Sequence, residues 1–155
     1  MSDETALRMI HLSGQGNEVS VVVTGRFGAG VPEHHDHLSA QLVVDAGVFR
    51  LHAEDVVTRG DLDEWSRCLD ALSIGDEATW RDTGRTIVLT VAPDDGGAIV
   101  TILDEPRSGA QLVVPVQLAD GWVLEQAGHL RAVLDAYPAE TVETSPGVCS
   151  WARPS

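Results

Sequence analysis

Two tryptophan-bearing segments place strict limits on how this chain can fold. The segments Asp61 to Leu69 and Asp120 to Gln126 each have the pattern of a helix opening, and each follows a run of short segments in which apolar and polar residues alternate. Alternation with a period of two indicates half-buried strands, whereas apolar residues three and four positions apart indicate a helix. The chain is therefore predicted to run strands, helix, strands, helix.

The boundaries of both helices can be predicted from residues that start and stop helices. Asp61 is expected to be the N-cap of the first helix, with Glu64 completing a capping box, and Gly75 is expected to end it. The second helix is expected to start after a cap at Asp120 and to end before Pro138. The apolar stripe of the first helix would consist of Leu62, Trp65, Leu69 and Leu72.

The segments between the helices predict short antiparallel strands. Hairpin-linked strands with one apolar face imply antiparallel pairing, and two helices are too few to cover both faces of a parallel sheet. Pro115 lies inside the last strand and cannot donate a ladder hydrogen bond, which predicts an edge strand or a bulge there. The predicted strands are Leu7 to Leu12, Val19 to Thr24, Leu38 to Val44, Phe49 to Glu54, Ala78 to Arg81, Thr86 to Val91, Ile99 to Leu103 and Leu112 to Leu118. In the fourth of them, Phe49, Leu51 and Ala53 are expected to face inward.

The predicted fold class is thus α+β, with about eight strands in the order β4-α-β4-α and two amphipathic helices packed on antiparallel meander sheets. The pattern is compatible with one curved sheet or with two packed sheets. Residues 1–138 are expected to form a single domain, because 155 residues can bury one substantial core. Residues 139–155 are rich in Thr, Ser and Pro and are expected to form a flexible polar tail.

The charge of the chain argues against one class of partner. The sequence contains 24 Asp plus Glu and 10 basic residues, which gives a formal net charge of −14. Phosphate backbones would be repelled, because binding them needs clustered Lys or Arg, so no nucleic-acid partner is expected. Two interpretations of the acidity remain open: solubility in a GC-rich genome where Arg and Ala replace Lys and Asn, or an acidic face that docks on a basic partner.

The chain shows no signal for export or membrane insertion. Its start, Met1 to Thr5, lacks the basic residues and apolar stretch of a secretion signal, and no apolar run approaches the length of a membrane span. Cys68 and Cys149 do not have zinc-binding spacing. A cytoplasmic protein with free thiols is expected, with no membrane partner, and Cys68 is expected to be a buried, inert thiol of the first helix.

A set of mainly structural residues carries a resemblance to known proteins. The set consists of Asp61-Leu-Asp-Glu-Trp65, Leu69 to Leu72, Trp80, Gly84, Val114-Pro-Val116 and Gly121-Trp122. With these residues the chain resembles a family of short actinobacterial proteins that is catalogued only as a domain of unknown function. The resemblance covers about Leu7 to Tyr137 and implies a compact α+β domain, with no catalytic residues to transfer. By analogy, some similar small acidic domains accompany bacterial toxins as immunity proteins.

The segment Glu33 to His37 is the best chemical candidate. Its three imidazoles and two carboxylates are ligand types that bind zinc or a similar divalent ion, although a His-rich tract is a purely compositional signal. In an extended segment His35 and His37 would share one face while His34 points away. His52, on a neighbouring predicted strand, is a further candidate, so the predicted ligand set is His34, His35, His37 and His52. The alternative is a polar loop that leads into a strand.

The remaining motifs carry less chemistry. Asp94-Asp95 is expected to be part of a hairpin turn, and the glycines from Gly25 to Gly30 lack the spacing of a dinucleotide-binding loop. Trp65, Trp80 and Trp122 are expected to fill the core. Trp151 lies in the polar tail, where it is either incidental or an anchor for a partner.

Three functions follow as hypotheses. The first is a non-catalytic cytosolic protein-interaction module with an acidic surface, immunity-like or accessory to a protein partner. The second is a metal-binding protein or small metalloenzyme built on His34, His35 and His37. The third is a structural subunit of a homo-oligomer. No catalytic residue and no organic cofactor are predicted.

Overall fold

The structure, a computed structural model, describes residues 6–152 of the chain. The segment considered above for a secretion signal, Met1 to Thr5, and the last residues of the tail, 153–155, lie outside this range. The described residues form two sheets of four strands, one hairpin and two helices. The first sheet has the order β1 (Leu7–Gly14), β2 (Asn17–Arg26), β3 (Leu38–Ala46), β4 (Phe49–Val57). The second has the order β5 (Ala78–Trp80), β6 (Val88–Asp94), β7 (Gly97–Leu103), β8 (Gln111–Gln117). The helices are α1 (Arg59–Ser73) and α2 (Trp122–Ala136), and the hairpin pairs β9 (Thr141–Ser145) with β10 (Val148–Trp151).

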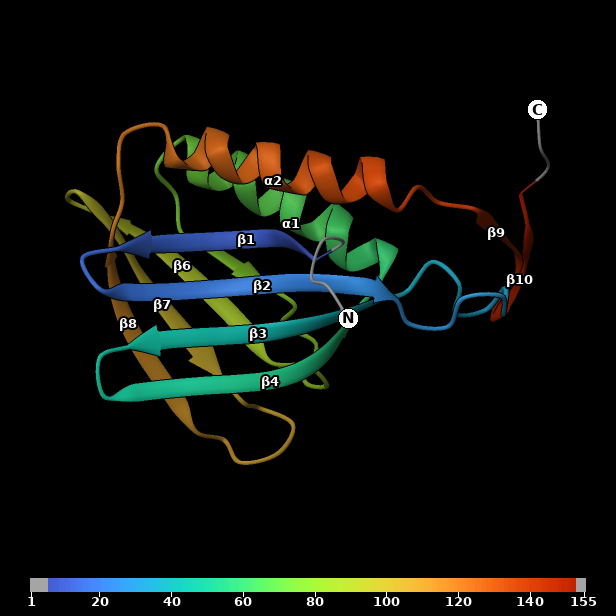
Figure 1. Cartoon of the computed structure of the whole chain (residues 1–155), viewed down its shortest axis with the longest axis horizontal. Helices are drawn as coiled ribbons and strands as arrows, with labels where there is room; N and C mark the ends of the chain where they lie inside the picture. Colours follow the sequence, from blue (N-terminus) through green and yellow to red (C-terminus); the bar gives the residue numbers. More distant parts are fainter. Residues whose placement is uncertain (1–5, 153–155) are drawn as a thin grey trace.

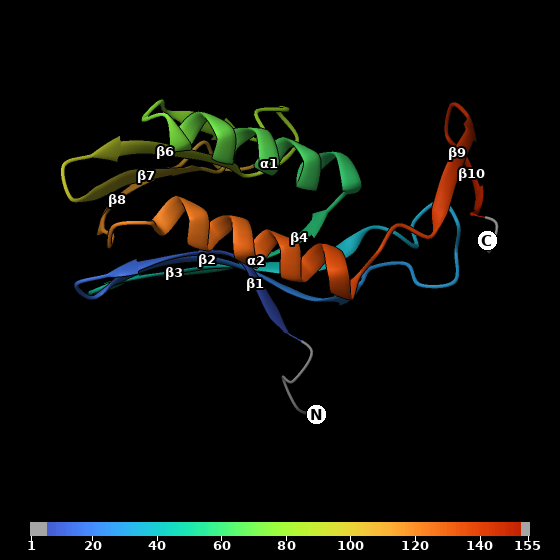
Figure 2. The ribbon, with the colours of Figure 1, turned by 90° about the horizontal axis from the view of Figure 1, so that it is seen from above.

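The predicted α+β class with antiparallel meander sheets is confirmed. The two sheets form two layers, with the strands of the second sheet crossing behind those of the first (Figure 1). Seen from above, α1 and α2 lie side by side over one edge of this sandwich (Figure 2). In this arrangement α2 packs along β1 and α1 packs against β5. The element order agrees with the predicted order of four strands, a helix, four strands and a helix, and the β9–β10 hairpin follows it.

One core fills the space between the sheets and the helices. Along β3, every second side chain from Leu38 to Val44 is at most 3% exposed, as expected for a strand with one buried face. Trp65 of α1 and Trp80 of β5 are fully buried and meet edge to face, with ring centroids 5.8 Å apart. The predicted role of these two indoles in the core is confirmed, and Trp122 is half-buried against the same cluster.

Helix α2 protects the edge of the first sheet. The side-chain amide of Gln126 is fully buried and forms two hydrogen bonds of 2.8 Å with the backbone of His11 in β1. Its oxygen accepts from the His11 N–H, and its nitrogen donates to the His11 carbonyl. The helix therefore supplies the hydrogen bonds that another strand would otherwise make, which is one way in which proteins blunt an edge strand.

A buried arginine joins both sheets to α1. Arg81 is 2% exposed, and its guanidinium forms an ion pair with Asp55 of β4 and lies 3.7 Å from the carboxylate of Asp61. It also stacks over the ring of Trp80 at 4.1 Å. Because a buried charge is stable only when it is paired, this cluster fixes the relative positions of the three elements.

The predicted caps of both helices are wrong. Thr58 is the N-cap of α1: its hydroxyl accepts a hydrogen bond from the Asp61 N–H, and the Asp61 carboxylate accepts one from the Thr58 N–H. Asp61 is thus the last residue of a box that starts at Thr58, at the third helical position, and Glu64 instead accepts from the Arg81 N–H. The N-cap of α2 is Gly121, whose φ of 83° suits glycine, and the Asp120 side chain does not cap the helix.

Other boundaries are confirmed. Gly75, with φ of 87°, comes directly after Ile74, the C-cap of α1, and stops the helix as expected, and α2 ends just before Pro138. Pro115 lies in β8, which is an edge strand of the second sheet. In β4, which is also an edge strand, Leu51 and Ala53 pack against the core as expected, whereas Phe49 at the beginning of the strand is 60% exposed.

The segment expected to be a flexible tail contains the β9–β10 hairpin. Its turn includes Gly147 with φ of 78°, and the preceding residue is Pro146, so the chain carries a Pro-Gly turn signal here. Figure 1 shows the hairpin projecting from the end of the sandwich where the loop between β2 and β3 lies. Within the described residues, neither helix is long and apolar enough to cross a membrane.

Candidate functional site

A groove lies where the end of α1 meets the start of α2. It encloses about 560 Å³ and is lined mainly by apolar groups of the two helices. The sequence builds it with two glycines in the left-handed region, Gly75 after α1 and Gly121 before α2, which let the chain turn sharply at both helix ends. The lining residues are Leu69, Asp70, Leu72, Ser73, Gly75, Gly121, Trp122, Val123, Leu124 and Ala127.

One large exposed apolar side chain lines this groove, and another is next to it along the chain. Leu124 of the lining is 78% exposed, and Ile74, which directly precedes the lining residue Gly75, is 76% exposed. Ile74 follows the last residue of α1, and Leu124 lies in the first turn of α2. Exposed apolar groups next to a hollow, rimmed by polar residues, are typical of surfaces that bind a partner.

The rim of the groove is acidic. Asp70 lines it, while Asp76 and Glu77 follow Gly75, and Asp120 and Glu125 flank its other side along the chain. All five carboxylates are exposed, and none of them forms an ion pair with another residue in the range 6–152. The last turn of α1 contains no basic residue either, so its partial negative charge adds to theirs.

The loop with the histidines is folded rather than extended. Backbone hydrogen bonds from His34 and His35 to Val31, and from His37 to His34, wind the segment into turns. As a result His34 and His37 face each other, with ring centroids 5.4 Å apart, while His35 points elsewhere. The expected pairing of His35 with His37 is therefore wrong. Burial, and then the proximity of His34, lower the pKa of His37.

The side chain of His35 contacts both its own loop and the segment that leads into the C-terminal hairpin. Its Nδ1 accepts a hydrogen bond from the Gly30 N–H at 3.0 Å, and its Nε2 lies 2.6 Å from a carboxylate oxygen of Glu140. The hydrogen bond from His35, helped by Arg26, lowers the pKa of Glu140. Both ring nitrogens of His35 thus have protein partners.

His52 lies far from the other three histidines. It sits opposite Val43, five residues along β3 from Leu38, which corresponds to about 17 Å of strand. Its Nε2 is 3.0 Å from the side-chain oxygen of Gln41. Among residues 6–152, no three His, Cys, Asp or Glu side chains are arranged to hold a metal ion. Metal binding by the predicted set stays a prediction, which elemental analysis of the untagged protein can test.

Asp36, in the same segment, is the residue that sequence reasoning missed. Its carboxylate is buried and accepts hydrogen bonds from the backbone N–H groups of Glu140 and Thr141, the Thr141 hydroxyl at 2.7 Å and the Arg26 guanidinium at 3.0 Å. Burial opposes its ionisation, but the hydrogen bonds from Thr141 and Glu140 outweigh burial and lower the pKa of Asp36. Asp36 therefore anchors the hairpin, and its partners lie more than 100 residues away in the sequence.

Trp151 packs against this anchor. Its ring meets that of His35 edge to face, with centroids 4.6 Å apart, and the residue is still 47% exposed. The contact explains why β10 lies against the loop. The role of Trp151 as an anchor for a partner stays a prediction.

Comparison with known proteins identifies the family of this chain. A family model described as "Family of unknown function (DUF5959)" matches residues 7–138. The chain belongs to this family. Neither the curated proteins nor the solved structures contain a match to it. The DUF5959 match contains both sheets, both helices and the whole groove, whereas β9, β10 and Trp151 follow it.

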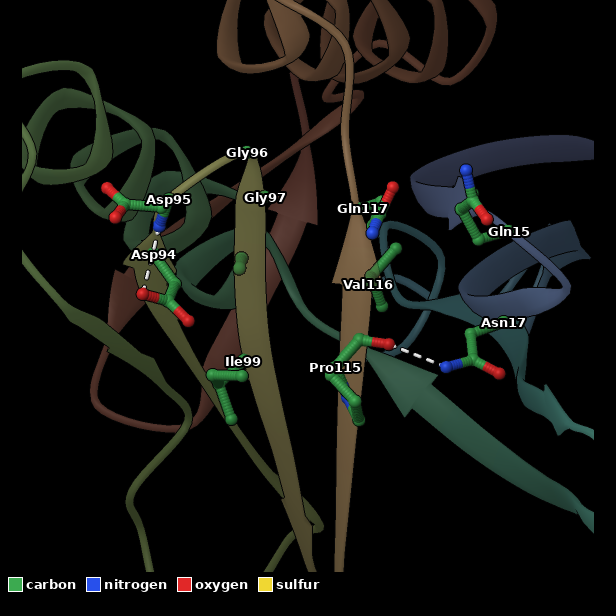
Figure 3. Close-up of a pocket in the computed structure, with 12 residues that line it drawn as sticks. Gln15, Asn17, Asp94, Asp95, Gly96, Gly97, Ile99, Pro115, Val116 and Gln117 are labelled. Atoms are coloured by element: carbon green, nitrogen blue, oxygen red, sulfur yellow. Dashed lines mark hydrogen bonds between the residues drawn. The ribbon is translucent and has the colours of Figure 1, made fainter.

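A second cleft of the DUF5959 domain encloses about 280 Å³ where the β1–β2 turn of the first sheet meets the second sheet (Figure 3). Here Gly14 approaches β8 so closely that a Cβ atom would lie 1.8 Å from the carbonyl oxygen of Gln117. The Asn17 amide also donates to the Pro115 carbonyl at 2.6 Å. Asp94 accepts from the N–H of Asp95 within the hairpin turn, as its turn chemistry predicted.

Cys68 is a buried thiol, as expected. Its sulfur lies 3.5 Å from the carbonyl oxygen of Thr79, and burial raises its pKa to about 11. At neutral pH it is therefore protonated, and a protonated thiol is a poor nucleophile.

Proposed function

We propose that this protein is a non-catalytic cytosolic interaction module that binds a basic amphipathic segment of a partner protein in the groove between α1 and α2. The observation that carries this proposal is the coincidence, in one place, of two exposed apolar side chains with unpaired carboxylates. Ile74 and Leu124 supply the apolar contact, and Asp70, Asp76 and Asp120 supply the charge.

Each part of the groove has a physical role in such a complex. Covering an exposed Leu or Ile side chain removes apolar surface from water, which stabilises by about 1.5–3 kcal/mol when burial is complete. The carboxylates speed the encounter with a basic partner and discriminate against acidic ones. An amphipathic helix meets both requirements, because one of its faces is apolar and the other can carry Lys and Arg.

The buried ionisable groups support a role without catalysis. Asp36 anchors the hairpin, Arg81 joins the sheets to α1, and Cys68 is held protonated by burial. Each of these groups is used by the fold itself. An immunity-like or accessory role is the concrete form of the proposal, since binding would mask a basic surface on the partner.

A labelled peptide tests the proposal. The probe is a fluorescein-labelled helical peptide of about five turns with Leu on one face and Lys on the other, and fluorescence anisotropy measures its binding. We expect saturable binding that weakens about tenfold or more between about 50 mM and about 500 mM salt, because screening shortens the reach of surface charges.

Matched variants locate the binding site. The double substitution Ile74→Ser/Leu124→Ser should weaken binding about tenfold, whereas Val48→Ser, which changes a 91%-exposed residue in the β3–β4 turn, should leave it unchanged. Asp76→Asn/Asp120→Asn should likewise weaken binding more than the equally charged control Asp95→Asn/Glu105→Gln. Equal losses for the test and control pairs would show that the probe follows net charge alone, and would contradict the proposal.

A further inference from the structure

The first sheet has a second edge, at β4, that no other element of the described residues pairs with. Figure 1 shows β4 as the last strand of the front sheet. The strand is nine residues long, and within residues 6–152 it pairs only with β3. The opposite edge, β1, is covered by α2 through Gln126, so the two edges of one sheet are treated differently.

The turn between β3 and β4 determines which backbone groups of β4 face outward. Gly47 and Val48 form a two-residue connection, so Ala46 and Phe49 are a hydrogen-bonded pair. Along β4, residues that hydrogen-bond to β3 then alternate with residues whose backbone groups point away from β3. The contacts of Val56 show that it belongs to the second kind. Its N–H donates to the Asp55 carboxylate at 2.8 Å, and its carbonyl accepts from Arg81 at 3.4 Å, away from β3.

By the same alternation, the N–H and carbonyl groups of Arg50, His52 and Glu54 also face outward. None of these six groups has a hydrogen-bond partner among the described residues. A row of free donors and acceptors along an edge is a template for one more strand.

A cleft lies alongside this row. It encloses about 470 Å³ between His52 to Asp55 of β4 and the two loops Arg85 to Ile87 and Asp104 to Arg107. An adjoining cavity of about 280 Å³ shares Ala53, Ile87 and Asp104 with the cleft. Its floor is apolar and consists of Leu51, Ala53, Ile87, Ile102 and Leu112.

The cleft contains two arginines that are free to pair with the carboxylates of a ligand. Arg85 and Arg107 are exposed, and their guanidinium groups form no hydrogen bond or ion pair within residues 6–152. The acids of the cleft have protein partners, although Glu54 and Asp104 keep their negative charge because these partners are neutral. Asp55 pairs with Arg81, Asp104 accepts from the N–H and hydroxyl of Ser108, and Glu54 accepts from the Gln41 amide at 3.0 Å.

We propose that the free edge of β4 is a second binding site, which takes an extended peptide segment of a partner with alternating apolar and acidic side chains. The peptide backbone pairs with Arg50, His52 and Glu54 and so extends the first sheet by one strand. Its apolar side chains enter the cavity above Ile87, and its carboxylates meet Arg85 and Arg107. This site is separate from the groove between the helices and does not depend on it.

Two labelled peptides test this site against the net charge of the protein. The probe is a fluorescein-labelled eight-residue peptide that alternates Val with Glu, and its counterpart alternates Val with Lys. Because the protein carries a net charge of −14, attraction by net charge alone would favour the Lys peptide. We expect the Glu peptide to bind at least about tenfold more tightly, as measured by fluorescence anisotropy. Tighter binding of the Lys peptide would overturn the proposal.

A proline substitution tests the strand pairing. His52→Pro removes an outward N–H without touching the hydrogen bonds to β3, whereas the control His52→Ala keeps that N–H. We expect the Pro variant to weaken binding of the Glu peptide about tenfold and the Ala variant to leave it unchanged. A Glu peptide N-methylated at alternate amides makes the same test on the unaltered protein. Equal binding by both variants, or by the methylated peptide, would overturn the proposal.

The arginines and the alternative occupant are tested separately. Arg85→Gln/Arg107→Gln should weaken binding of the Glu peptide, while Arg67→Gln/Arg131→Gln, with the same charge change on the helices, should not. A solution mass measurement then asks whether a second copy of the chain fills the edge. A dimer that dissociates on His52→Pro would show that the edge is a self-association surface, and would overturn the proposal.

Discussion

The two edges of the first sheet differ in what covers them. At the edge of β1, α2 covers the strand and Gln126 satisfies its backbone, and the two helices add an apolar groove rimmed by acids. At the edge of β4 the backbone is uncovered among residues 6–152, and two arginines without an ion pair in that range line the cleft beside it. A net charge of −14 agrees with the acidic groove but does not describe the β4 edge. The two proposals therefore assign opposite charge preferences to the two edges.

The largest expected effect contrasts two arginines, one between the sheets and one at the open edge. Arg81→Met leaves Asp55 in a half-buried position without its partner, so it should lower the free energy of unfolding by about 3–5 kcal/mol. The control Arg85→Met changes an exposed residue and should shift it by less than about 0.5 kcal/mol. Urea unfolding followed by circular dichroism measures both. Similar losses for the two variants would contradict the role given to Arg81.

The next effect contrasts two glutamines, each beside an edge strand. Gln126→Ala leaves the His11 N–H and carbonyl buried without partners, which should cost about 2–3 kcal/mol of unfolding free energy. Gln41 bonds His52 and Glu54 on the exposed face, so Gln41→Ala should cost less than about 0.5 kcal/mol. If Gln126→Ala were as mild as its control, α2 would not be what protects β1.

The β9–β10 hairpin is attached to the rest of the protein through Asp36, and its release should leave both edges of the first sheet intact. Asp36→Asn removes the charge that holds the backbone of Glu140 and Thr141, so amide exchange in 141–151 should accelerate about tenfold while the sheets stay protected. Glu33→Gln, at an exposed neighbouring acid, is the control. Hydrogen exchange followed by mass spectrometry gives the result, and faster exchange throughout the sheets would contradict a local role.

The same anchor should fail in acid. The pKa of Asp36 is lower in the folded protein than in the unfolded chain, so its stabilising contribution is complete above the unfolded pKa and is lost as pH falls through the folded value. We therefore expect the hairpin to be released only below about pH 4, where an ordinary aspartate begins to protonate. Release at a pH near 6 would mean that a histidine, and not Asp36, controls the attachment.

The smallest expected effect concerns the two thiols and changes no stability. Cys68 is buried on α1, where burial raises its pKa to about 11, while Cys149 is partly exposed in the hairpin. A disulfide reagent at about pH 8 should modify Cys149 rapidly, and Cys68 only after the fold opens in denaturant. Rapid modification of both thiols in the native protein would show that the packing around α1 opens easily.

Local patterns in the sequence predicted most of the fold. Alternating residues identified the eight strands of the two sheets, and the stripe of Leu62 and Trp65 identified α1, because each signal reports which face of an element is buried. Pro115 identified an edge strand for a similar reason, since proline lacks the N–H that an inner strand needs. These signals require no knowledge of distant residues.

The predictions that failed depend on longer-range or competing contacts. The cap of α1 was misplaced because Asp61 can serve both as an N-cap and, at the third helical position, as the last residue of a box that begins at Thr58. The pairing of His35 with His37 was expected only for an extended segment, and the turns that fold this segment depend on backbone bonds that composition does not indicate. The anchoring of the hairpin by Asp36 joins residues more than 100 positions apart, which no local pattern encodes.

The groove itself could be predicted only in part. Ile74 and Leu124 are ordinary apolar residues in the sequence, and their exposure follows from how two helix ends meet in space. The acids beside them stood out only as part of a general excess. Charge at the sequence level suggested an acidic docking surface, and the location that we propose for it is the groove where α1 packs on α2, which is lined mainly by apolar groups.

The most direct test of the proposed docking groove is a titration of ¹⁵N-labelled protein with the Leu–Lys helical peptide, followed by backbone amide chemical shifts. We expect shifts concentrated in residues 69–77 and 120–127, with the amides of β4 unmoved. Shifts spread evenly over the exposed acids of both sheets, or centred away from the helices, would contradict this proposal.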